Sequence, residues 1–298
     1  MAKKSKKRKN TFEKILLQTG LFLINTLSQK QVKNLLNFIA VNVGYRIGIR
    51  KKLVKTQIKR CFPEFKQSEI NDITKRMYQN YGLMIYEILK SDKDALVKTF
   101  EIEGEEHYQA ATNYKGSYII SSGHYGNWEM MGHYLIQNGM KLSAVAKKQR
   151  NPYFDKFFVD FRQNLGLDLI YQKGAMRGII KAIRADRKIL LVIDQDGRKS
   201  GEIMPFLGHD ASVFMGVARI AIKTKIPIVP MYHVRTKEGK HKLVVEKMIF
   251  PNQENLTDIE VMTILNQSLE NMIRRYPELW FWVHKRWKSV DRSKGIRY

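Results

Sequence analysis

The sequence predicts an α/β fold, with a mixed and mostly parallel sheet flanked by helices, behind a helical N-terminal extension. The first observation is that short apolar runs alternate with segments of helical periodicity from about residue 100 onward. The second is that apolar residues over 51–100 recur at three- and four-residue steps, which is the spacing of one helix face. We therefore expect one α/β domain of residues 51–298, preceded by a separate segment of residues 1–50.

The elements of the expected domain follow in order along the chain. Pro63 divides two helices within 51–100, because proline interrupts a helical pattern. Strands are expected at Ser117–Ser121, Leu142–Ala146, Leu167–Tyr171, Ile189–Ile193, Ile228–Val234 and Leu243–Lys247. Helices are expected between them at Trp128–Asn138, Pro152–Leu165, Ala175–Asp186 and Ser212–Lys223, with a late amphipathic helix at Asp258–Arg275.

The first 50 residues combine a basic tail with two apolar segments. Met1 to Asn10 carries six Lys or Arg, and Ile15–Leu27 is apolar but shorter than the roughly 20 residues that cross a bilayer. Val32–Arg50 is amphipathic, with basic side chains interspersed. We interpret residues 12–50 as helices that lie on a membrane surface, with the N-terminus held on the cytoplasmic side by its positive charge. A spanning helix, or packing against the protein's own core, are the alternatives.

The net charge of +25 indicates a polyanionic partner, either nucleic acid or an anionic membrane with its phosphorylated lipids. The sequence contains no zinc-ligand spacing, RNP-like strand or clear helix-turn-helix, so we expect no nucleic acid. Cys61 is the only cysteine, which excludes a disulfide or a cysteine-based metal site within the chain.

A histidine and a glutamate follow the first expected strand of the domain. The run Tyr118-Ile119-Ile120 stops at Ser121-Ser122-Gly123, and His124 and Glu129 come next in a His-x4-Glu pattern. We expect His124 to precede a helix that holds Glu129 in its first turns, because only then can the two side chains meet. A carboxylate fixes the tautomer of an imidazole and stabilises its cation, so the pair is typical of a general base.

Two further polar clusters follow strand ends. Lys147 to Arg150 comes after the second strand, and Asp194 comes after the fourth. Because the carboxyl ends of parallel strands meet at one edge of the sheet, we expect these groups to form one site with His124. Asp194-Gln195-Asp196 also has spacing that suits a divalent ion, but no third ligand accompanies it, so we expect no metal.

The ordered motifs resemble those of the bacterial lipid A biosynthesis acyltransferases, within the wider lysophospholipid and glycerolipid acyltransferase superfamily. The resemblance extends from about residue 12 to 288. It rests on RCFPE at 60–64, GHYGNWE at 123–129, Asn151-Pro152, DQDG at 194–197, PFLG at 205–208, IVP at 228–230, and PELW at 277–280 followed by HKRWK at 284–288.

The resemblance implies transfer of a fatty acyl chain from an acyl carrier protein thioester to a hydroxyl of a lipid A precursor, at the cytoplasmic face of the bacterial inner membrane. His124 would be the general base with Glu129 as its partner, and no cofactor would be needed. The family has an important arginine a few residues before the Asn-Pro pair; Lys147 stands at the matching place, Arg150 could substitute for it, and either would bind the phosphorylated acceptor. Asp194 matches a later acidic motif and would orient a cation or the acceptor.

Two other functions and the location of the tryptophans also have to be considered. The same base chemistry would serve an acyltransferase that acts on a lysophospholipid, an ornithine lipid or a glycolipid, with acyl-CoA as donor. A Ser-His-Glu hydrolase is disfavoured because no Gly-x-Ser-x-Gly motif occurs. Trp280, Trp282 and Trp287 suit either a membrane–water interface or a packed edge of the sheet.

Overall fold

A computed structural model describes residues 2–236 and 238–296 of the chain, and it confirms an α/β architecture. The main sheet has seven strands in the order β1-β9-β8-β2-β5-β3-β4, and every pairing is parallel except that of β8 with β9. Its strands are β1 (Phe100–Glu103), β2 (Ile119–Ser122), β3 (Leu142–Ala146), β4 (Asp168–Tyr171), β5 (Lys188–Val192), β8 (Ile228–Arg235) and β9 (His241–Val245). The strand β2 lies at the centre, so both of its faces are buried.

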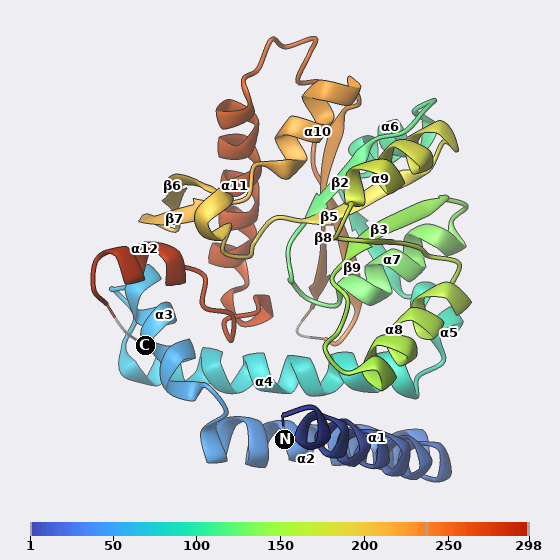
Figure 1. Ribbon diagram of the computed structural model, residues 1–298, viewed down its shortest axis with the longest axis vertical. Coiled ribbons are helices and arrows are strands. Elements are labelled where there is room, and N and C mark those ends of the chain that lie inside the picture. The colour runs from blue at the N-terminus through green and yellow to red at the C-terminus, as the bar shows by residue number, and fades with distance from the viewer. Residues whose placement is uncertain (1, 237, 297–298) are drawn as a thin grey trace.

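Helices cover both faces of this sheet (Figure 1). Successive residues of the central strands, such as Ile119 and Ile120, point to opposite faces and belong to two different apolar clusters. One face packs against α9 (Ala175–Arg184), α10 (Gly216–Thr224) and α11 (Asp258–Arg275), and the other against α6 (Glu105–Asn113) and α7 (Trp128–Gln137). At the far edge, α8 (Pro152–Asn164) packs against β4.

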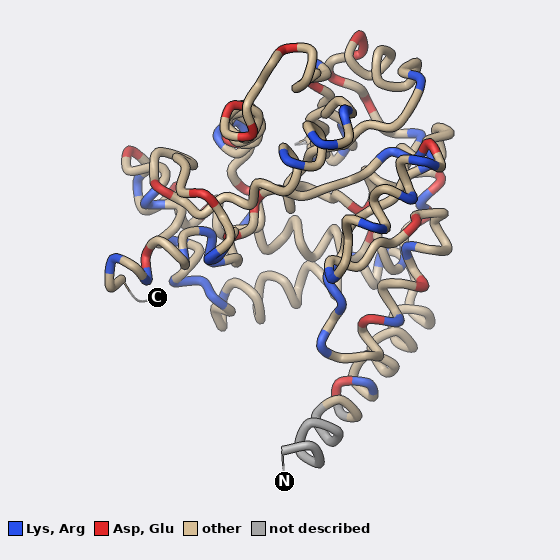
Figure 2. Tube along the Cα trace, turned by 45° about the horizontal axis from the view of Figure 1, so that its top comes forward, with Lys and Arg blue, Asp and Glu red and all other residues tan. Residues whose placement is uncertain are grey.

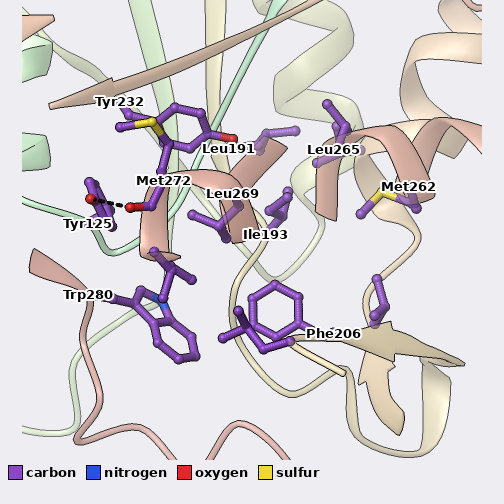
Figure 3. Close-up of a cluster of buried hydrophobic side chains, with 14 of the residues drawn as sticks. Tyr125, Leu191, Ile193, Phe206, Tyr232, Met262, Leu265, Leu269, Met272 and Trp280 are labelled. Atoms are coloured by element: carbon purple, nitrogen blue, oxygen red, sulfur yellow. Dashed lines mark hydrogen bonds between the residues drawn. The ribbon is translucent and has the colours of Figure 1, made fainter. Parts of the chain in front are cut away.

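Figure 3 shows the apolar cluster on the first of these faces. Side chains of α11, including Leu265 and Leu269, meet Leu191 and Ile193 from β5 and the segment after it. The Tyr125 hydroxyl donates to the Met272 carbonyl over 2.8 Å, which fastens the loop after β2 to α11. The cluster therefore anchors the loop after β2 to α11.

The N-terminal part is a layer of helices beside the sheet. Figure 1 shows α4 (Gln67–Leu89) between the sheet and α1 (Ala2–Thr26) with α2 (Gln29–Ile39). The layer is completed by η1 (Ala40–Gly48), α3 (Lys51–Cys61) and α5 (Lys93–Val97). A Cβ at Gly82 of α4 would lie 3.0 Å from the Leu36 carbonyl of α2, so glycine permits this close helix crossing. Among the described residues, no helix is both long and apolar enough to cross a membrane.

Several large apolar side chains of this layer face solvent. Phe22 is 66% exposed, Phe38 is 61% exposed and Ile47 is 77% exposed. At the same time α1 contacts α8, where the Asn151 side chain donates to the Glu13 carboxylate over 2.6 Å. The layer thus packs on the protein through one side and presents apolar side chains on another. Its division from the rest of the chain at residue 50 stays a prediction.

The predicted helix at Ser212–Lys223 is wrong in its first part. Residues 202–213 form a two-stranded hairpin of β6 (Glu202–Phe206) and β7 (His209–Val213), and α10 begins only at Gly216. Leu207 and Gly208 both have positive φ, as a two-residue hairpin turn of the primed type requires. Ser212 and Val213 pair with Ile203 and Glu202 across this turn, so the start of the predicted helix belongs to the hairpin.

The C-terminal tryptophans lie in the core, so the membrane-interface interpretation of them is wrong. Trp280, Trp282 and Trp287 are each at most 1% exposed, and the first two pack edge to face with ring centroids 4.5 Å apart. Their segment is not a strand but a series of turns between η3 (Pro277–Leu279) and α12 (Lys288–Ser293). The Trp280 indole packs against Phe206 of the hairpin, in the same cluster as the apolar side chains of α11 (Figure 3).

Candidate active site

The loop that carries His124 leaves the carboxyl end of the central strand. β2 ends at Ser122, and α7 begins at Trp128, so the loop has only five residues. Gly126 has a φ of +58°, and a Cβ there would lie 2.2 Å from the His233 carbonyl oxygen. Only glycine allows the chain to turn this close to β8. The turn leaves the His124 side chain 19% exposed at the edge of the sheet.

The carboxylate that contacts His124 is Asp194, which follows β5 beside β2. Nδ1 of His124 lies 2.8 Å from Asp194 Oδ1, and the His124 backbone N–H donates to Oδ2 over 2.9 Å. Because Asp194 accepts, Nδ1 carries the proton and Nε2 keeps its lone pair when the ring is neutral. The Trp280 indole donates to the same Oδ2 over 3.0 Å. Asp194 is thus held from three directions and is 4% exposed.

The electrostatics of the pair suit proton transfer. Burial alone would raise the pKa of Asp194, but the charge of His124 and hydrogen bonds from His124 and Trp280 lower that pKa to about 2. Burial alone would lower the pKa of His124, but the Asp194 carboxylate outweighs it and raises that pKa above its ordinary value. The imidazole is therefore a stronger base than a free histidine, with a permanent anion behind it.

Glu129 has a different partner, and this corrects the prediction that it holds the imidazole. It lies in the first turn of α7 and is 8% exposed. Arg162 of α8 binds it through two nitrogens, with Nε 3.1 Å from Oε2, and the Trp128 indole donates to Oε1 over 3.2 Å. The carboxylate in contact with the imidazole is that of Asp194, while a role of Asp194 in orienting the acceptor stays a prediction.

Arg162 is a residue near the candidate site that the sequence prediction did not include. Trp128 contacts both the His124 ring and the Glu129 carboxylate, so the Glu129–Arg162 ion pair lies one side chain away from the imidazole. The signal was present in the sequence, because Arg162 stands four residues after Phe158 and directly after Phe161 on the apolar side of an expected helix. A cation at such a position needs a buried anion, and Glu129 supplies it.

Aromatic rings surround the imidazole. The Trp128 ring lies edge-on with its centroid 5.1 Å from that of His124, and the Phe281 ring lies 6.0 Å away. The backbone N–H of Phe281 donates to the His124 carbonyl over 3.1 Å, and that of Gly126 donates to the Leu279 carbonyl over 2.9 Å. The turns after α11 therefore form one wall of the site and tie its loop in place.

A buried hydrogen-bonded ring holds the loop from the other side. The Asn127 backbone donates to His233 Nδ1 over 2.8 Å, and His233 Nε2 lies 2.8 Å from His241 Nδ1. His241 Nε2 faces Glu87, whose carboxylate accepts from the Asn127 side chain over 2.7 Å and from Arg235. Asn127 also caps α7 by accepting from the Met130 backbone. One residue thus links the loop, the helix and the strands β8 and β9.

The predicted cations lie at the surface of the protein. Lys147 and Arg150 are exposed, in the loop between β3 and α8. That loop is tied to α8 by the Gln149 backbone, which donates to the Asp155 carboxylate over 2.7 Å. The structure therefore brings His124, Glu129 and Asp194 together, while a role of Lys147 or Arg150 in substrate binding stays a prediction.

The arrangement can remove a proton from a hydroxyl. Nε2 of His124 keeps its lone pair in the neutral ring, because the other nitrogen is bound to a buried carboxylate. Such a ring acts as a general base and later returns the proton as a general acid. Apolar rings line its surroundings, which suits a substrate with a hydrocarbon part.

Comparison with known proteins finds acyltransferases. A family model described as bacterial lipid A biosynthesis acyltransferase matches residues 1–289. The chain is similar to a lipid A biosynthesis acyltransferase of Haemophilus influenzae strain Rd, with 20% identity over 252 residues, which are 82% of this chain and 78% of that protein. It is also similar to the lipid A biosynthesis lauroyltransferase of Escherichia coli K12, with 23% identity over 258 residues and coverage of 84% and 82%. A phosphatidylinositol mannoside acyltransferase of Mycolicibacterium smegmatis is 23% identical over 218 residues, covering 70% of this chain and 69% of that protein.

Proposed function

We propose that this protein, which belongs to the bacterial lipid A biosynthesis acyltransferase family, transfers a fatty acyl chain from an acyl carrier protein thioester to a hydroxyl of a lipid A precursor. The observation that carries the proposal is the His124–Asp194 pair at the carboxyl end of the central strand. The acyl donor and the acceptor are inferred from the family and from the names of the relatives, which include a lauroyltransferase.

The reaction follows from the geometry of the pair. Nε2 of His124 takes the proton of the acceptor hydroxyl as its oxygen attacks the thioester carbonyl carbon. The tetrahedral intermediate then collapses, the carbon–sulfur bond breaks, and His124 returns the proton to the departing thiolate. Asp194 keeps Nδ1 protonated and stabilises the imidazolium between these steps. A base so placed supplies roughly 10²–10⁴-fold acceleration.

The cations have two proposed roles. Arg162 is fixed by Glu129 beside His124, so the pair would position the acceptor or donor against the base. Lys147 and Arg150 are exposed in the loop after β3, where flexible cations can reach the phosphate groups of a lipid headgroup. Glu129 then serves catalysis through Arg162 and not through the imidazole.

The N-terminal layer suggests how the enzyme meets its lipid. Phe22, Phe38 and Ile47 are exposed apolar side chains on helices that also carry many cations. Such helices bind an anionic membrane surface through apolar burial and electrostatic attraction together. We therefore place the protein at the cytoplasmic face of the bacterial inner membrane, bound through this layer. Figure 2 shows Lys and Arg on many separate parts of the described chain as well, which adds to the attraction.

A second candidate acceptor is a different membrane glycolipid. The similarity to a phosphatidylinositol mannoside acyltransferase favours this alternative, because that name describes acyl transfer to a glycosylated phospholipid. The chemistry at His124 would be unchanged, and acyl-CoA would serve as donor in place of acyl carrier protein. Mass spectrometry of the acylated product separates the two candidates.

The test combines purified protein, two donors and two acceptors. Lauroyl-acyl carrier protein and lauroyl-CoA are each supplied with a lipid A precursor or with a phosphatidylinositol mannoside, and the products are identified by mass. We expect acylated lipid A precursor with the carrier-protein donor, and its loss in the His124→Ala variant. Undiminished transfer by folded His124→Ala would overturn the mechanism, and transfer to the mannoside alone would replace the acceptor.

A further inference from the structure

The Gln195 side chain touches the nitrogen on which the reaction depends. Its Nε2 lies 3.4 Å from Nε2 of His124, and the side chain is exposed. Because Nδ1 of His124 donates to Asp194, Nε2 is an acceptor in the neutral ring, and the Gln195 amide must present its N–H to it. The amide thus occupies the place that the acceptor hydroxyl takes during the reaction.

The backbone of Gln195 is fixed on both sides. Asp194 before it binds His124 and Trp280. Asp196 after it accepts from the Ser289 backbone over 2.7 Å and from the Ser289 hydroxyl over 2.6 Å, and its own N–H donates to His284 over 3.2 Å. Only the Gln195 side chain is free to turn, so its amide can leave Nε2 without moving the loop.

The tetrahedral intermediate needs hydrogen-bond donors for its oxyanion, and the backbone near His124 has little to offer. The N–H groups of His124, Gly126 and Asn127 already donate to Asp194, to the Leu279 carbonyl and to His233. These three groups cannot form the backbone oxyanion hole that many acyl-transfer enzymes use. The exposed Gln195 amide, next to Nε2 of His124, is a side-chain donor that can take that part instead.

We propose that Gln195 is a further catalytic residue, whose amide caps Nε2 of His124 in the resting enzyme and donates a hydrogen bond to the oxyanion during transfer. The acceptor hydroxyl displaces the amide from Nε2 and gives its proton to that nitrogen. As the hydroxyl oxygen bonds to the thioester carbon, the carbonyl electrons move onto oxygen, next to the displaced amide. The oxyanion then re-forms the carbonyl, the carbon–sulfur bond breaks, and His124 protonates the thiolate. This role rests on the proposed acyltransferase function.

The test compares Gln195→Ala and Gln195→Glu with Gln137→Ala, which changes an exposed glutamine at the end of α7. Lauroyl-acyl carrier protein and a lipid A precursor are the substrates, and thiol release is followed across pH. We expect kcat of Gln195→Ala to fall about 100-fold, as for the loss of one oxyanion donor, with KM for the acceptor changed less than about threefold. The kcat of Gln195→Glu should fall further than that of Gln195→Ala, because its carboxylate repels the oxyanion.

The pH profile adds a readout that misfolding would not produce. An amide that donates to Nε2 favours the neutral imidazole, and a carboxylate there favours the cation. The acid limb of kcat should therefore move to higher pH in Gln195→Glu, while Gln137→Ala matches the wild type. A kcat of Gln195→Ala within about threefold of wild type, or an effect on KM alone, would overturn the proposal.

The His124→Ala variant distinguishes a failure of the proposed acyltransferase function from a failure of the role of Gln195. If His124→Ala retains wild-type turnover, the proposed acyltransferase mechanism fails, and the role of Gln195 falls with it. If His124→Ala is inactive while Gln195→Ala is unimpaired, only the role of Gln195 fails.

Discussion

The loop of residues 123–127, which carries His124, and the N-terminal layer of helices are attached to the rest of the protein in different ways. The loop is fixed by buried hydrogen bonds from four separated parts of the chain, through Asp194, Leu279, His233 and Glu87. The layer is fixed to the protein on one side only and exposes side chains such as Phe22 and Ile47. The loop is thereby held rigid for chemistry, whereas the layer retains apolar surface for a partner.

From this difference we expect substitutions in the two regions to affect different properties of the protein. In the loop, polar groups of His124, Gly126 and Asn127 have partners within the protein, so removing one partner leaves a charge or donor unsatisfied. In the layer, the exposed side chains contribute little to folding, so changing them should affect binding alone.

Asp194→Asn should reduce turnover about 10⁴-fold, the loss seen when the carboxylate of a Ser-His-Asp triad is replaced by amide. The amide no longer fixes the Nδ1-protonated tautomer of His124. Without the anion the pKa of His124 falls, so the acid limb of the residual activity should move to lower pH. Steady-state rates across pH check both effects, and a profile unchanged in position would contradict them.

Arg162→Met should lower the free energy of unfolding by about 3 kcal/mol, because it leaves the largely buried Glu129 carboxylate without its counter-charge. The double variant Arg162→Met with Glu129→Gln should recover most of this loss. Urea unfolding of the three proteins measures it. A double variant no more stable than Arg162→Met would show that the pair is not coupled.

Replacing Phe22, Phe38 and Ile47 together with serine should weaken binding to vesicles that contain anionic lipid by about 100-fold, since each side chain loses apolar burial in the bilayer surface. The melting temperature should stay close to that of wild type. Flotation assays measure binding, with the exposed Ile203→Ser of β6 as matched control. Equal flotation of all three proteins would place the membrane contact elsewhere.

Acid should destabilise the protein through its buried histidines. Burial lowers the pKa of His241 from 6.5 to about 4 and that of His233 well below 6.5. Because the unfolded chain binds these protons first, stability is fully present above pH 6.5 and is lost as pH falls toward 4. His241 alone should contribute a loss of about 2 kcal/mol between pH 7 and pH 5. The free energy of unfolding of His241→Asn should depend less steeply on pH between 7 and 5 than that of the wild type. The same pH dependence in both proteins would refute the prediction.

Lys147→Ala with Arg150→Ala should raise KM for the phosphorylated acceptor about tenfold and leave kcat close to wild type, because these exposed cations would hold the headgroup and not the reacting atoms. Initial rates at varied acceptor concentration separate the two constants. A fall in kcat with unchanged KM would instead place one of them at the reaction centre.

The sequence predicted the features that depend on local pattern. The alternation of apolar runs and helices indicated the parallel sheet, and the strand end before His124 located the site. It did not predict which carboxylate meets the imidazole, because Glu129 is near in sequence while Asp194 is brought there only by the pairing of β2 with β5. The β6–β7 hairpin was missed for a related reason, since its turn signal lies in two residues between short runs.

The central claim is that Asp194, and not Glu129, orients the base. Proton NMR of the imidazole tests it, because an Nδ1 proton held by a buried carboxylate resonates far downfield and is protected from exchange. We predict such a signal in the wild type and in Glu129→Gln, and its loss in Asp194→Asn and in His124→Ala. A downfield signal that survives in Asp194→Asn and disappears in Glu129→Gln would contradict the account.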